Sequence, residues 1–67
     1  MSEEYKDMLI HELKERGYND IVIHSMEIHD KSFVAYASFT WNLNGWIKQV
    51  NNIMKLGHIE NGILKIF

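Results

Sequence analysis

Apolar residues in the first part of the chain recur at spacings of three and four positions. The recurring residues are Tyr5, Met8, Leu9 and Leu13. This spacing places them on one face of a helix, which has about 3.6 residues per turn. Acidic residues precede this stripe, basic residues follow it, and Gly17 supplies a stop signal. The pattern predicts a helix over residues 3–16.

Two later segments, 21–29 and 32–41, are rich in β-branched and aromatic residues and are separated by two polar residues. This composition predicts a β-hairpin. With a two-residue loop, residues equally far from the loop face each other, as far as Val22 opposite Phe39. Because side chains alternate between faces, this register gathers apolar residues on one face. That face carries Val22, His24, Met26, Ile28, Phe33, Ala35, Ala37, Phe39 and Trp41.

A further set of apolar residues returns to helical spacing after the hairpin. Its members are Leu43, Trp46, Ile47, Val50, Ile53 and Met54. Asn42 or Asn44 suits the cap at the start of a helix, and Gly57 suits its end. These signals predict a second helix over residues 45–56.

The C-terminal residues 63–67 have the composition of a strand, and Asn61-Gly62 is a strong turn pair. They could form a third strand, or one half of a short hairpin with residues 58–60. A third strand beside the first gives the order 2-1-3, with both helices on the apolar face. We therefore expect one α+β domain over residues 1–67, in the order helix, β-hairpin, helix and short C-terminal strand. Two helices would pack on one face of a small two- or three-stranded antiparallel sheet.

The opposite face of the predicted hairpin is less polar than a face turned only to water. Single apolar residues on a strand surface are common, but several together indicate an interface. The C-terminal strand also offers an edge for pairing or strand exchange with another chain. These features predict a homodimer or partner interface formed by Ile21, Ile23, Val34, Tyr36, Ile66 and Phe67.

Length and composition narrow the classes of protein. With 67 residues the chain builds one small core, and a dimer would add stability. It has no cysteine, so it forms no disulfide and no thiolate metal site, which fits a reducing compartment. Its apolar runs are too short for a membrane span or a signal peptide. We therefore expect a cytoplasmic protein.

Charge is distributed unevenly along the chain. Residues 1–31 hold eight acidic and four basic residues, a net charge of −4, whereas residues 32–67 hold one acidic and three basic residues, a net charge of +2. The two tryptophans of the second half, with its lysines, suggest single-stranded nucleic acid as an alternative ligand, although the cations are few. The acidic residues of the first helix either form a solvated face or imitate nucleic acid. This exposed acidic face comprises Glu4, Asp7, Glu12 and Glu15.

The histidines are the candidates for metal binding or general-base chemistry. His24 and His29 lie on opposite faces of the predicted strand, so they cannot converge on one ion. On the apolar face, His24 is expected to be a hydrogen-bonded core histidine that makes stability sensitive to pH. No nucleophile elbow and no glycine-rich phosphate loop occurs in the sequence. We therefore expect no catalytic, cofactor or metal site.

These observations favour a small non-catalytic protein–protein interaction module. We expect an accessory regulator or inhibitor that acts as a homodimer on a larger partner, a class that bacteriophages and mobile elements often encode. A nucleic-acid-binding accessory protein is the first alternative. A histidine-based metal-dependent enzyme is the second.

Overall fold

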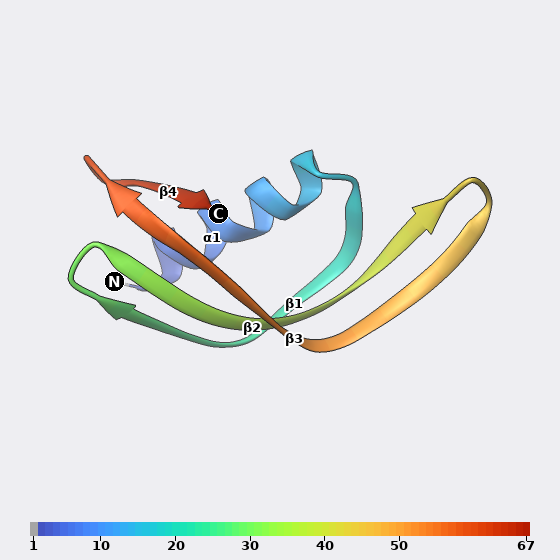
Figure 1. Ribbon diagram of the computed structural model, residues 1–67, viewed down its shortest axis with the longest axis horizontal. Helices are drawn as coiled ribbons and strands as arrows, with labels where there is room; N and C mark the ends of the chain where they lie inside the picture. The colour runs from blue at the N-terminus through green and yellow to red at the C-terminus, as the bar shows by residue number, and fades with distance from the viewer. Residues whose placement is uncertain (1) are drawn as a thin grey trace.

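The computed structural model describes residues 2–67 as one helix and a four-stranded antiparallel sheet (Figure 1). The elements are α1 (Ser2–Glu15), β1 (Tyr18–His29), β2 (Ser32–Leu43), β3 (Trp46–Glu60) and β4 (Ile63–Ile66). The strands lie in chain order, β1-β2-β3-β4, so each forms a hairpin with the next. The helix packs on one face of this sheet, and the other face is open. The fold is mainly β, which corrects the expected arrangement of two helices on a smaller sheet.

The first predicted helix is confirmed. It carries acidic residues in its first turn and a lysine in its last turn, as the helix dipole favours. Leu9 and Leu13 of its apolar stripe are completely buried. The backbone N–H of Gly17 donates to the Lys14 carbonyl at 2.9 Å and ends the helix. The apolar stripe and the stop signal at Gly17 were therefore sufficient to predict this helix.

The second predicted helix, residues 45–56, is wrong, because this segment is most of strand β3. Asn44 and Gly45 both have positive φ, at 52° and 87°, and form a two-residue turn rather than a helix cap. A β-bulge in β3 then places two residues, Asn51 and Asn52, opposite Ser38. The extra residue brings Trp46, Val50 and Ile53 onto one face at spacings of four and three. A bulged strand thus reproduces the spacing of a helix.

The predicted register of the first hairpin is confirmed from its loop as far as the pair Ser25 and Tyr36. Beyond that pair the register shifts by one residue at His24 and again before Asn19. Val22 therefore lies opposite Ser38 rather than Phe39. The first shift moves Val22 and His24 to the open face and turns the neighbouring isoleucines toward the helix.

The core lies between α1 and the helix-facing side of the sheet. Its buried residues are Leu9, Leu13, Phe33, Ala35, Ile59 and Leu64. Gly57 allows close packing here, because a Cβ at this position would overlap the Phe33 ring and the Lys65 carbonyl oxygen. The C-terminal residues form the hairpin alternative, with β4 paired to the end of β3, so the expected strand order 2-1-3 is wrong.

The outer half of the β2–β3 hairpin extends beyond the helix and curves toward the helix side of the sheet (Figure 1). We call residues 40–49 the arm. Strand β1 borders the arm only at its base, where Tyr18 pairs with Trp41 and Asn19 with Thr40. The arm and β4 lie toward opposite ends of the molecule, which measures 39 × 19 × 18 Å. The molecule therefore has a packed body and a projecting two-stranded ribbon.

Candidate functional site

The arm exposes large apolar side chains. Trp46 is 79% exposed and Ile47 is 74% exposed, and they point to opposite faces of the ribbon. Trp46 pairs with Leu43 and shares a face with Trp41. A shallow hollow of about 380 Å³ lies along this surface. Its lining residues are Trp41, Leu43, Asn44, Trp46, Ile47 and Lys48.

The base of the arm is anchored to the body by aromatic contacts. The Tyr18 ring stacks on the Phe39 ring at 4.2 Å between centroids and meets the edge of Trp41 at 6.2 Å. The Lys55 ammonium lies 5.5 Å from the Tyr18 centroid and 5.6 Å from the Phe39 centroid, in cation–π range. The apolar strip of the arm is therefore continuous with the core face.

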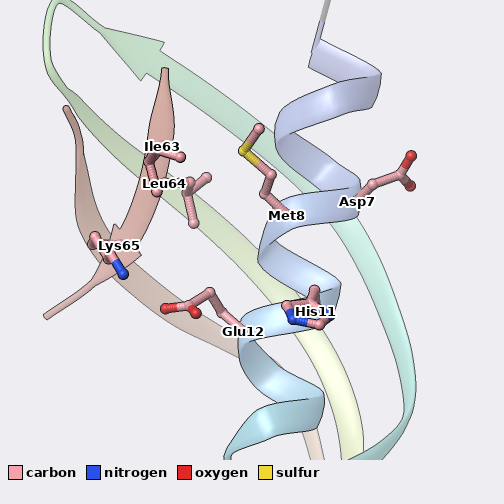
Figure 2. A pocket seen from close by; sticks show the side chains of 7 residues that line it. All are labelled: Asp7, Met8, His11, Glu12, Ile63, Leu64 and Lys65. Atoms are coloured by element: carbon pink, nitrogen blue, oxygen red, sulfur yellow. The ribbon is translucent and has the colours of Figure 1, made fainter. Parts of the chain in front are cut away.

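A second hollow, the α1–β4 groove, lies between the helix and the last strand (Figure 2). It has a volume of about 320 Å³ and is lined by Asp7, Met8, His11, Glu12, Ile63, Leu64 and Lys65. In Figure 2 the Met8 and Glu12 side chains point from the helix toward β4, whereas Asp7 points away from it. Leu64 is buried in the core, and Ile63 is half exposed. The groove thus has an apolar floor with a carboxylate at its margin.

The predicted acidic face lies on α1 and borders this groove. Asp7 and Glu12 line it, and Glu4 and Glu15 follow at helical spacing on the same side of the helix. Glu15 Oε1 lies 3.7 Å from His11 Nε2 on the exposed surface. Two residues of the predicted acidic face, Asp7 and Glu12, therefore lie at a hollow.

The structure divides the six residues of the predicted interface between two faces. Ile21, Ile23 and Ile66 are partly buried and pack against the core on the helix-facing side of the sheet. Val34 and Tyr36 remain on the open face. There they join cross-strand neighbours and the highly exposed Phe67, which stacks on His58 at 5.4 Å. We call Val34, Tyr36, Met54, Leu56 and Phe67 the open-face patch.

His24 is exposed, so the expectation of a core histidine is wrong. The β1 bulge turns it away from the helix, and its Nε2 forms a hydrogen bond with Ser38 Oγ at 2.6 Å. Ser38 Oγ also accepts the backbone N–H of Asn52 at 3.0 Å. These contacts link the bulges of β1 and β3 across β2. His24 therefore has a structural role.

The remaining histidines pair with carboxylates at the surface. His29 Nε2 lies 3.0 Å from Glu27 Oε1, and His58 Nε2 lies 3.9 Å from Glu60 Oε2. Over residues 2–67, no three His, Asp or Glu side chains are grouped to hold a metal ion. In the same range, α1 is too short and too polar to cross a membrane.

Sequence reasoning missed the arm and the groove. The available signal was Asn44-Gly45, a preferred two-residue hairpin turn, between two segments rich in large apolar residues. Comparisons of the chain with protein-family models, curated proteins and solved structures found no match. Its function is therefore inferred from the geometry and chemistry of these surfaces.

Proposed function

We propose that this protein is a non-catalytic protein–protein interaction module whose contact element is the arm. The observation that supports the proposal is the exposure of Trp46, at 79%, on a ribbon whose two faces are both open to solvent. Tryptophan is among the residues that contribute most binding energy when an interface covers them. Apolar clusters on a small protein also mark binding surfaces.

The chemistry of the arm indicates the kind of partner. Lys48 is the one charged residue between positions 40 and 49, and residues 31–59 contain no acidic residue. A complementary surface would offer an apolar hollow for Trp46 with a carboxylate beside it for Lys48. Inserting a projecting ribbon into such a hollow would block it. The protein would then act as an accessory regulator or inhibitor of its partner.

The same charges favour a protein over nucleic acid. Affinity for a phosphate backbone comes from several cations that displace counterions together. The arm supplies Lys48, and Lys55 is already placed over two aromatic rings of the body. A gel-shift assay with single-stranded DNA at low salt separates the two classes, because a nucleic-acid binder would retard the DNA strongly under those conditions.

Affinity capture with matched variants tests the proposal. The bait is the whole chain, and the lysate comes from the cells in which its gene occurs. We expect a stoichiometric protein partner with the wild type, and its loss with Trp46→Ser. Val22→Ser is the control, because Val22 is an apolar residue that is 53% exposed on the open face and lies outside the arm. Equal capture by wild type and Trp46→Ser would refute the arm as the contact element.

A further inference from the structure

We propose that the arm binds a second copy of this chain, with Trp46 of each protomer seated in the α1–β4 groove of its partner. The inference rests on the proposed function, since it takes the arm as the contact element and names what covers it. The chain itself carries the surface that the arm requires, an apolar hollow beside a carboxylate. The dimer contact would then consist of the arm and the α1–β4 groove, and neither surface belongs to the interface predicted from the sequence.

The size and lining of the groove suit an indole side chain. Its volume of about 320 Å³ is small, and its floor is formed by Met8 and Leu64. Methionine is flexible and makes favourable contacts with aromatic rings. Trp46 would exchange a largely solvent-exposed position for contact with these side chains. Removing this large apolar surface from water favours the contact.

The spacing between Trp46 and Lys48 on the arm also matches the spacing between Met8 and Glu12 in the groove. Trp46 and Lys48 are two residues apart on one face of β3, a separation of about 7 Å along a strand. Met8 and Glu12 are one turn apart on α1, a separation of about 6 Å along a helix. With Trp46 on Met8, Lys48 therefore falls near Glu12. Lys65 occupies the β4 side of the groove, so the alignment that places Lys48 on the helix side is favoured.

The shape of the molecule makes the contact intermolecular and reciprocal. The arm and β4 lie toward opposite ends of the long axis, so an arm cannot reach its own groove (Figure 1). The arm curves toward the side of the sheet that carries α1, and α1 forms one wall of the groove (Figure 1). A two-fold rotation exchanges the two ends and sets each arm opposite the partner's groove. Such an isologous contact closes at a dimer.

The exposed surface area of the chain is larger than that expected of a compact monomer, which favours a binding partner. The chain exposes 4906 Å², whereas a compact monomer of 8.0 kDa is expected to expose roughly 4,450 Å². A stable dimer buries about 800 Å² per protomer. Each protomer would contribute both an arm and a groove, so each buries two patches. A two-stranded ribbon is also marginally stable in water, and the partner's surface would support it.

Sedimentation velocity over a range from low to high micromolar concentration tests the dimer with the whole chain. We expect the wild type to shift from monomer to dimer, and Trp46→Ser to remain monomeric. Lys48→Glu and Glu12→Lys should each weaken the dimer by about threefold to tenfold, and combining them should restore it. Circular dichroism confirms that each variant is folded, and Val22→Ser should dimerise like the wild type.

A mixing experiment tests the reciprocity. Met8→Glu blocks the groove and leaves the arm intact, whereas Trp46→Ser leaves the groove intact. A mixture of the two monomeric variants retains one complete contact, so we expect a heterodimer weaker than the wild-type dimer. If Met8→Glu fails to fold, Ile63→Glu replaces it as the groove variant, because Ile63 lines the groove and is 51% exposed.

Three results would overturn the inference. A wild type that stays monomeric at every concentration excludes the second copy, while the capture experiment still decides whether the arm binds another protein. Loss of the dimer with Trp46→Ser but not with the groove variants would mean that two arms stack on each other. Loss with Tyr36→Ser but not with Trp46→Ser would place the dimer contact on the open-face patch.

Discussion

Ser38 and His24 lie on neighbouring strands and form a hydrogen bond of 2.6 Å at the point where the sheet changes register. His24 is the extra residue of the β1 bulge, and Asn51 and Asn52 form the β3 bulge opposite Ser38. Bulges increase local twist and bend a strand. The arm begins beside this point, so its direction depends on the paired bulges.

Replacing Ser38 with alanine should destabilise the protein. The half-buried hydroxyl accepts the Asn52 N–H, and an unpaired backbone donor costs about 1–3 kcal/mol where water cannot replace the partner. Ser38 is partly accessible, so we expect a loss of about 1–2 kcal/mol in the free energy of unfolding, measured by urea denaturation. Ser25→Ala on the exposed side of β1 is the control and should change stability by less than about 0.5 kcal/mol. Equal effects would show that the hydroxyl does not hold the bulges.

Sequence reasoning predicted the elements that depend on local signals. The stripe containing Leu9 and Leu13, with Gly17 after it, identified α1. The two-residue loop identified the register of the first hairpin up to Tyr36. These features follow from periodicity and turn chemistry within a few residues.

The bulges account for most of the errors. A one-residue insertion reverses the faces to which the following side chains of a strand point. No short sequence pattern predicts such an insertion. The bulge at His24 exchanges the two faces of β1 only in the part of the strand before Ser25. The sequence pattern therefore assigns Ile21 and Ile23 to an interface, although they pack on the core. In β3 the bulge gives the apolar residues the spacing of a helix. The sequence pattern consequently assigns Trp46 to the apolar stripe of a helix and does not predict the arm, which depends on a pairing between two strands. The acidic residues of α1 were identified, but the groove beside them requires β4, which is distant in sequence.

Gly57→Ala should be severely destabilising. The added Cβ would overlap both the Phe33 ring and the Lys65 carbonyl oxygen, and the backbone oxygen cannot move without displacing β4. Overpacking of a core costs about 1–3 kcal/mol, and we expect the upper end or global unfolding. Thermal denaturation measures the effect. Leu56→Ala, next to it on the open face, should cost less than about 1 kcal/mol, and a Gly57→Ala variant as stable as Leu56→Ala would contradict the packing of β4 on Phe33.

Two leucines should differ widely when each is truncated to alanine. Leu13 is completely buried between α1 and the sheet, so Leu13→Ala should cost about 2–5 kcal/mol through lost contacts and a cavity. Leu43 is 51% exposed on the arm, and Leu43→Ala should cost less than about 1 kcal/mol in the monomer. Urea denaturation at low protein concentration compares the two. A large loss with Leu43→Ala under these conditions would mean that the arm packs on the body.

Gly45→Ala should loosen the arm without affecting the body. Gly45 has φ of +87°, and a side chain in this left-handed region costs about 1–2 kcal/mol, although nothing lies within 4 Å of the position of its Cβ. The cost should fall on local opening of the ribbon, because the arm contributes few buried contacts. Hydrogen exchange at low protein concentration should therefore accelerate by about fivefold to thirtyfold in residues 40–49. Exchange in Phe33 and Ala35, whose strand pairs on both sides in the core, should stay unchanged, and uniform acceleration would instead show that arm and body unfold together.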